Sequence, residues 1–161
     1  MKYTLMNSSG RADLLSHLGT MPEYLDSRFG QLSREDATRP GPGNGFSPVE
    51  QCWHLADLER EGFARRMQRI RAENQPALPD FDGSAIARER NYRGKSLAEA
   101  LAAFRAARAA SIAFIQTIRA EEWDRDGEQA GVGTVHLCDI PVMMLEHDTA
   151  HRAEIEEWFR Q

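Results

Sequence analysis

Two helix-capping signals, each followed by apolar residues at helical spacing, constrain the fold of this chain most strongly. In Ser47-Pro48-Val49-Glu50 a serine precedes a first-turn proline, and a glutamate follows three residues later, which is the pattern of a capping box. Ser96-Leu97-Ala98-Glu99 repeats the serine–glutamate pattern. The sequence therefore predicts one helix from residue 47 to about 73 and another from residue 96 to about 118.

Two more helical regions lie at the ends of the chain. In the first region, the motif Thr20-Met21-Pro22-Glu23 follows Gly19 and has the form of a capping box. It predicts a short helix over about 10–18, a break, and a second segment over about 21–35. In the last region, Asp139 precedes Pro141 and is suited to cap a helix that runs towards the C-terminus.

The segments between these helices are rich in proline and glycine, and none alternates like a strand for long. Residues 39–45 form a loop; because Phe46-Ser47-Pro48 follows, this loop lacks the lysine of a phosphate-binding loop. Residues 74–95 are long enough for a crossover and include a possible short helix over 84–91. We expect an all-α protein, a four-helix bundle with a long crossover connection, in a single domain over 1–161.

The charge balance argues against nucleic acid as the main partner. Twenty basic residues stand against twenty-five acidic ones, which gives a net charge of −5. The local run of Arg65, Arg66, Arg69 and Arg71 is interleaved with glutamates and is interpreted as a solvated helix face. The expected partner is a small-molecule substrate.

The sequence also favours a protein that is neither membrane-bound nor disulfide-linked. It has no leader-like N-terminus and no apolar stretch of the roughly 20 residues that span a bilayer, so we expect a cytoplasmic location. Cys52 and Cys138 are widely separated and outside any Cys-x-x-Cys spacing, which disfavours a thiolate zinc site. Cys52 lies on an apolar stripe and is expected to be a core residue.

The His-x-x-x-His pair His147 and His151 is the strongest sign of chemistry. Residues four apart on a helix share one face, so two imidazoles there can converge on one ion. Both histidines fall in the middle of the apolar stripe formed by Ile140, Met143, Met144, Ile155 and Trp158. Two core histidines bonded to backbone or carboxylates are the alternative, but two on one buried stripe favour a metal.

A catalytic metal site needs a third protein ligand. The run His-Asp-x-x-His resembles the metalloprotease helix, but aspartate is shorter than glutamate and the sequence ends ten residues after His151, so we expect no protease and a solvent-facing Asp148. The upstream candidates are His17, His54 and His136. Periodicity places His54 at the flank of its apolar stripe, and the choice among the three stays open on spacing alone.

At this point the chain resembles the DinB-like superfamily (DinB/YfiT proteins). The residues from Ser47 to Asp57 look like its second-helix motif, and Leu145 to Arg152 look like its last-helix motif. Asn91-Tyr92-Arg93 and the run Arg105–Arg108 are similar too. The resemblance extends from about Leu14 to the end of the chain.

This resemblance implies that His54, His147 and His151 bind one divalent metal, with zinc or nickel as the leading choices. It also implies a homodimer and an enzyme that activates a low-molecular-weight thiol, or water, for attack on an electrophilic small molecule, as in a thiol S-transferase. A metal-dependent hydrolase and a non-catalytic, metal-stabilised stress-response or interaction bundle are the alternatives. An open coordination position on the metal would favour either enzyme over the non-catalytic bundle.

Three further side chains have competing interpretations. Asp57 could orient a ligand or act as a base, and Glu154 could support His151, but either could equally be an exposed helix carboxylate. Arg108 interrupts an apolar stripe together with Ser111. It could bind a substrate carboxylate, although a structural arginine that pairs an inter-helix carboxylate is favoured.

Overall fold

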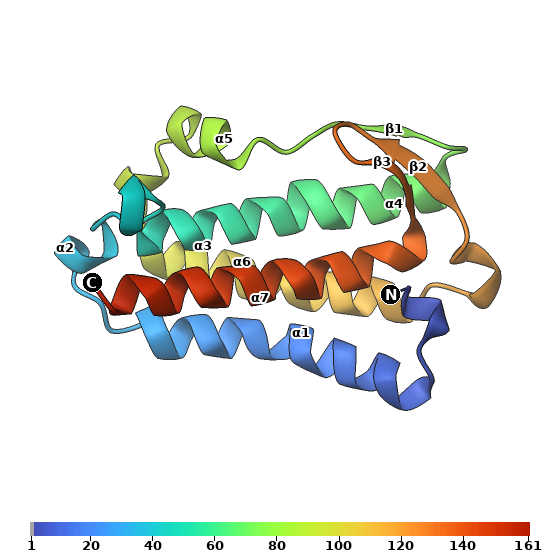
Figure 1. The fold of residues 1–161 in the computed structure, drawn as a ribbon, viewed down its shortest axis with the longest axis horizontal. Helices are drawn as coiled ribbons and strands as arrows, with labels where there is room; N and C mark the ends of the chain where they lie inside the picture. The colour runs from blue at the N-terminus through green and yellow to red at the C-terminus, as the bar shows by residue number, and fades with distance from the viewer. Residues whose placement is uncertain (1) are drawn as a thin grey trace.

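The computed structural model describes residues 2–161 and forms an elongated bundle of four long helical rods (Figure 1). The first is α1 (Ser8–Phe29). The second is continuous and consists of α3 (Pro48–Asp57), a π-helical segment (Leu58–Ala64) and α4 (Arg65–Ala72). The third and fourth are α6 (Leu97–Gln116) and α7 (Ile140–Phe159). The predicted four-helix bundle is confirmed, and Ser47 and Ser96 cap the helices at the predicted positions.

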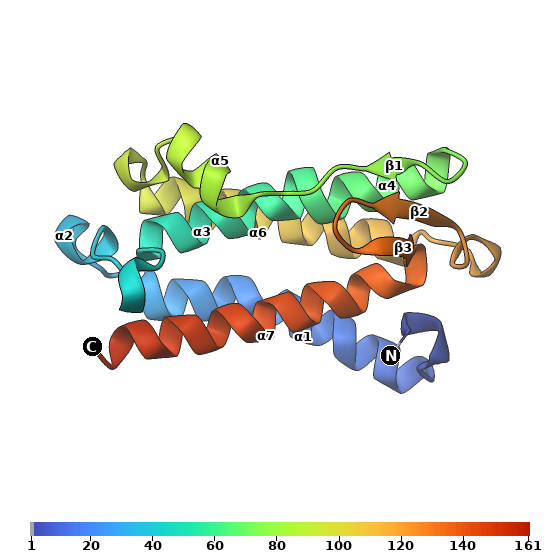
Figure 2. The ribbon, with the colours of Figure 1, turned by 45° about the horizontal axis from the view of Figure 1, so that its top comes forward.

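The connectivity explains the long crossover. In Figures 1 and 2, α1 and α7 run in one direction, and α3–α4 and α6 run in the other. Because α3 and α6 are parallel neighbours, the chain must return along the whole bundle between them. This crossover contains β1 (Ala77–Leu78), α5 (Gly83–Glu89) and a 3-10 turn (Tyr92–Gly94), so the short helix predicted over 84–91 is present almost as expected.

The break predicted in the first helical region is wrong. α1 runs without interruption past Pro22, and only the separate short helix α2 (Arg34–Ala37) follows it. Proline lacks an N–H and therefore leaves the carbonyl of Leu18, four residues earlier, without its usual helical donor. The guanidinium of Arg108 on α6 donates to that carbonyl at 2.9 Å. A tertiary contact thus satisfies the group that would otherwise favour a break.

A small sheet forms where the sequence predicts only loops. β2 (Asp126–Gln129) and β3 (Gly133–His136) pair antiparallel, and β1 pairs parallel to β2. Strands of two to four residues are too short to show alternation in the sequence. Gly127 allows the close approach, since a Cβ there would lie 2.9 Å from the carbonyl oxygen of Pro76.

Two apolar clusters form the core, and the histidine pair lies between them on α7. One cluster includes Leu18, Met67, Ile70, Leu137 and Met144. The other includes Met21, Phe29, Cys52, Phe104 and Ile155. His147 and His151 fall in sequence between Met144 and Ile155, so the polar centre is enclosed at both ends by apolar packing.

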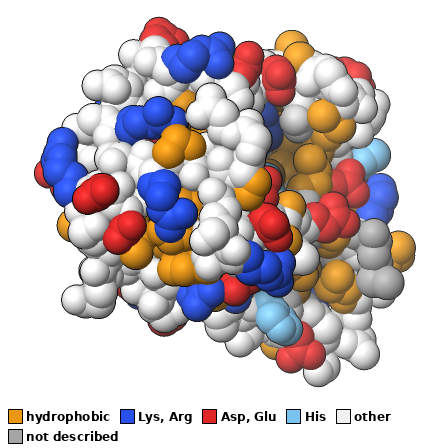
Figure 3. All heavy atoms as spheres, turned by 60° about the vertical axis from the view of Figure 1, so that its left-hand side comes forward, with side chains coloured by type: hydrophobic (Ala, Val, Ile, Leu, Met, Phe, Trp, Pro, Cys, Tyr) orange, Lys and Arg blue, Asp and Glu red, His pale blue; other side chains and the backbone are white. Residues whose placement is uncertain are grey.

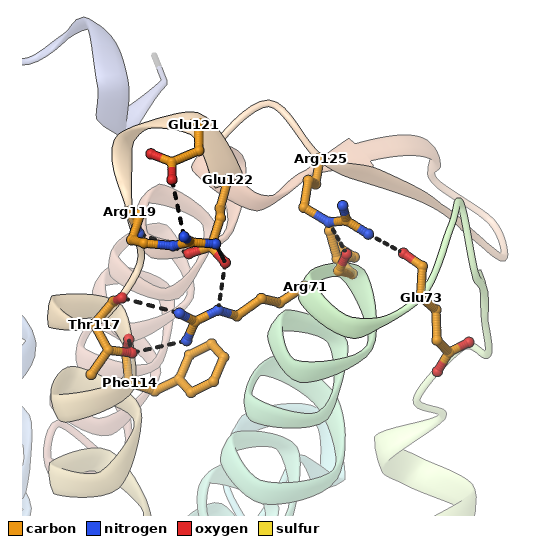
Figure 4. A network of polar contacts seen from close by, with 9 residues as sticks. Arg71, Glu73, Phe114, Thr117, Arg119, Glu121, Glu122 and Arg125 are labelled. Atoms are coloured by element: carbon orange, nitrogen blue, oxygen red, sulfur yellow. Dashed lines mark hydrogen bonds and ion pairs between the residues drawn. The ribbon is translucent and has the colours of Figure 1, made fainter.

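Polar contacts join the helix ends far from the histidines (Figure 4). Arg71 at the end of α4 donates to Glu122 at 3.0 Å and to the carbonyl of Thr117 at 3.2 Å. Arg125 donates to the carbonyl oxygens of Ile70 and Glu73. These contacts fix the end of α4 against the turn that follows α6.

The surface carries both signs of charge. Acidic and basic side chains are interspersed over the face shown in Figure 3. No helix within residues 2–161 is long and apolar enough to cross a membrane. The four arginines at 65–71 were predicted to lie on a solvated helix face, and this prediction is wrong for Arg66, which is buried. Arg65 is exposed, and Arg69 pairs with Glu73.

Candidate metal centre

The three histidines predicted as ligands lie together inside the bundle. His54 comes from α3, and His147 and His151 come from successive turns of α7. Their ring centroids are 5.6, 5.1 and 4.3 Å apart. One nitrogen of each ring lies within 4.8 Å of the corresponding atoms of the other two, so the three rings converge on one small volume.

Two neighbours fix the tautomer of His151. Its Nδ1 lies 2.6 Å from Oε1 of Gln51 and 3.1 Å from Oε2 of Glu154. Gln51 in turn donates from Nε2 to Glu154 at 2.9 Å, which orients its amide. Because both neighbours present acceptors, Nδ1 of His151 carries the proton. Its Nε2 then has a free lone pair in the neutral ring.

That lone pair is directed at the other histidine of α7. Nε2 of His151 and Nε2 of His147 are 3.0 Å apart. Two nitrogens that bind one zinc ion at about 2.0–2.1 Å each are separated by roughly this distance when the angle at the metal is near 90°. The pair therefore has the spacing of two ligands of one ion.

His54 completes the group from the opposite helix. It is 8% exposed, and its Nδ1 is buried with no hydrogen-bond partner among the described residues. A Cβ at Gly83, the first residue of α5, would lie 2.7 Å from this Nδ1, so only glycine leaves room for the ring. An unpartnered imidazole of this kind fits a site that binds an additional group.

The protein surroundings keep two of these rings neutral. Burial, reinforced by the neighbouring His151, lowers the pKa of His54 to about 4. Burial and the charges of His151 and His54 lower the pKa of His147 to about 3. Only a neutral imidazole can bind a metal, so the donor set fits a divalent cation at neutral pH.

A cavity of about 740 Å³ leads to the histidines from the C-terminal end of α7. His54, His151, Gln51 and Glu154 line it together with the loop at residues 41–46 and the side chain of Trp158. The cavity is large enough for a small organic molecule to reach two of the three rings.

Asp57 is buried and does not line this cavity. It is 2% exposed and accepts hydrogen bonds from Tyr92, from Arg90 at 2.7 Å and from Arg60 at 2.5 Å. Burial raises the pKa of Asp57, but these three donors outweigh it and the pKa is lowered overall. The exposed-carboxylate interpretation is wrong; Asp57 fastens the crossover to α3.

The prediction that Asp148 faces solvent is also wrong. Asp148 is 2% exposed and pairs with Arg108 at 2.6 Å, while Glu59 of the π segment pairs with the same guanidinium at 2.9 Å. With the carbonyl of Leu18, these groups use the hydrogen-bonding capacity of all three guanidinium nitrogens. Arg108 therefore has the structural role that the sequence favoured, since it pairs carboxylates of two other helices. Ser111 is buried on the same helix.

The other two candidate histidines are remote from the cluster. His17 is exposed on α1, where its Nδ1 lies 2.8 Å from the carbonyl oxygen of Asp13. His136 ends β3, and its Nδ1 is 3.4 Å from Asp139. Asp139 occupies the N-cap position of α7 as predicted, but its carboxylate accepts from the backbone N–H of His136 instead of from the first turn of α7.

Two residues of the centre were missed from the sequence. Gln51 lies three positions before His54, so helical spacing could have placed it on the same face. Gly83 carries no such signal, because its contact with His54 depends on how the crossover folds back.

The structure combines a four-helix bundle with a buried group of three histidines that borders a cavity, which is the arrangement of a metal-binding helical bundle. The model of the DinB superfamily matches residues 17–155, and the chain belongs to that superfamily. The structure is similar to YfiT from Bacillus subtilis, described as a probable metal-dependent hydrolase with an unusual four-helix bundle topology. The TM-score is 0.87 at 17% identity, over 96% of this chain and 89% of that one, which shows the shared fold. No curated protein matches the sequence.

Proposed function

We propose that the protein is a metal-dependent enzyme in which His54, His147 and His151 hold one divalent ion, zinc or nickel. The observation that carries the proposal is the convergence of three imidazoles, two of them held neutral by burial, beside a cavity of about 740 Å³. An ion bound there would lower the pKa of a coordinated water to roughly 7, or stabilise a thiolate directly. The substrate is an electrophilic small molecule.

The surrounding residues favour a low-molecular-weight thiol as the nucleophile. Glu154 is the carboxylate nearest the histidines in the cavity, but its hydrogen bond from His151 lowers its pKa to about 2. An acid of that strength is a poor general base near neutral pH. A thiol has a lower pKa than water and needs less help from a base, so we infer a thiol S-transferase.

A metal-dependent hydrolase is the second candidate, and the description of the Bacillus subtilis neighbour favours it. We further propose that the enzyme is a homodimer, which rests on the family resemblance alone, and that it is cytoplasmic, which rests on the sequence pattern. Sedimentation of the purified protein tests the dimer.

One kinetic comparison separates transfer from hydrolysis. Zinc-loaded or nickel-loaded protein is incubated with an electrophilic aryl halide, with and without added cysteine or other small thiols. Turnover only with a thiol, and its loss in His147→Ala, is expected. Equal turnover without thiol would replace the transferase by the hydrolase, and no metal-dependent turnover of either kind would contradict the proposal.

A further inference from the structure

A second cavity, of about 370 Å³, reaches the histidine cluster from the other side. His147 lines this cavity, whereas His54 and His151 line the larger one. Phe63, Phe81 and Met143 give it apolar walls. The cluster therefore separates two spaces, and only the larger one is used by the function proposed above.

A buried cation lines this smaller cavity. Arg66, at the start of α4, is 7% exposed and makes no hydrogen bond or ion pair with any of residues 2–161. Arg108, the other buried arginine, has two carboxylates and a carbonyl around it. The nitrogens of Arg66 keep some contact with solvent but have no partner among the described residues, so an anion in the cavity would stabilise the guanidinium.

An unsatisfied acceptor lies on the wall of the same cavity. Gln129, at the end of β2, is 7% exposed, and its Oε1 is buried without a hydrogen-bond partner among the described residues. A buried amide oxygen requires a donor. The cavity thus presents one buried cation and one buried acceptor to whatever occupies it.

Two carboxylates limit the charge that can enter. Asp80 and Glu146 line the cavity and are both exposed. Burial lowers the pKa of Arg66 and the charge of Asp80 opposes that effect, although the two groups form no ion pair. A second negative charge on the ligand would face these carboxylates, which selects against dianions.

We propose that this cavity binds a small monocarboxylic acid with an adjacent hydroxyl or ammonium group. Arg66 binds the carboxylate through its planar fork, and the amide oxygen of Gln129 accepts from the hydroxyl or ammonium. In the enzyme proposed above this places the acid beside His147, and only that last step rests on the proposed function.

Titration of metal-free protein tests the binding. Glycolate, glycine, acetate and succinate are added at millimolar concentrations while the arginine and glutamine side-chain N–H signals are followed by NMR. Glycolate or glycine should shift the signals of Arg66 and Gln129 with saturation, acetate more weakly and succinate least. The better of glycolate and glycine identifies the donor as hydroxyl or ammonium.

Matched variants make the test specific. Arg66→Gln should weaken binding by about tenfold or more, whereas Arg65→Gln, at the exposed neighbour, should not. Gln129→Leu should abolish the preference for glycolate or glycine over acetate and leave acetate binding intact; this variant keeps the test valid if Arg66→Gln does not fold.

Absence of a saturable shift at Arg66 with all four acids, or equal binding by Arg66→Gln and Arg65→Gln, would overturn the inference. Because metal-free protein is used, acid binding without metal-dependent turnover would contradict only the proposed function. Turnover without acid binding would contradict only this inference.

Discussion

The orientation of His151 depends on the Gln51 amide together with the Glu154 carboxylate. Gln51 accepts from Nδ1 of His151 and donates to Glu154, so it holds both partners in place. Groups that orient a metal-binding histidine in this way commonly change metal affinity by about 10–100-fold when removed.

We therefore expect Gln51→Leu to weaken zinc binding by about 10–100-fold. Competition with a chromophoric chelator measures the affinity. Gln68→Leu, at an exposed position on α4, is the matched control and should bind as the wild type does. Equal affinities for the two variants would show that Gln51 does not orient His151.

The position of His54 depends on the absence of a side chain at Gly83. A Cβ at Gly83 would lie 2.6 Å from Cε1 of His54, whereas a Cβ at Gly19 would meet only Ile112, at 3.8 Å. Gly83→Ala should therefore displace His54 and lower metal affinity. Gly19→Ala should leave affinity unchanged and raise helix stability by up to about 1 kcal/mol. Calorimetric titration with zinc, together with urea unfolding, compares the two; undiminished affinity in Gly83→Ala would refute the packing argument.

Some residues of the metal centre could be predicted from the sequence and others could not, for physical reasons. His147 and His151 are four apart on one helix, so their proximity is local and readable. His54 was selected only by the family resemblance, because its distance from α7 depends on helix packing. Asp148 and Arg66 were predicted as exposed, since helical projection cannot show which flank of a helix a neighbour covers.

At the scale of the helices, a buried charge group joins the bundle. Arg108 of α6 binds Glu59 of the π segment and Asp148 of α7, next in sequence to His147. The proline within α1 contributes to it through the freed carbonyl of Leu18. The charge group therefore connects all four helices at the level of the metal centre.

Removal of the arginine should be costly. Arg108→Met leaves two buried carboxylates without their partner and should destabilise the protein by about 3–5 kcal/mol, measured by urea unfolding. The triple variant Arg108→Met, Glu59→Gln, Asp148→Asn removes the uncompensated charges and should recover part of the loss. A cost below about 1 kcal/mol for Arg108→Met would mean that the charge group does not hold the helices together.

At the scale of the whole molecule, burial of neutral histidines couples folding to pH. The folded-state pKa of His54, about 4, and that of His147, about 3, lie below the unfolded value of 6.5. The unfolded state thus binds more protons below pH 6.5. Stability from neutral burial is complete above that pH and is lost as pH falls towards the folded values.

The melting temperature of metal-free protein should therefore fall between about pH 6.5 and 4. The double variant His54→Leu, His147→Leu lacks both groups and should fall less steeply over the same window. Thermal unfolding followed by circular dichroism compares the two proteins. Parallel curves would contradict neutral burial of these histidines.

The overall architecture was more predictable than its details. Capping boxes and helical periodicity are local signals, and they predicted the bundle and its crossover. The addition of β1 to the sheet depends on pairing between residues about fifty positions apart, and the continuous α1 depends on a contact from α6. Neither leaves a local pattern in the sequence.

The metal content of five histidine variants tests the central claim most directly. Elemental analysis of purified protein should find about one zinc or nickel ion per chain in the wild type. The metal should be largely lost in His54→Ala, His147→Ala and His151→Ala, and retained in His17→Ala and His136→Ala. Equal metal content in all five variants would contradict the assignment of the three-histidine centre.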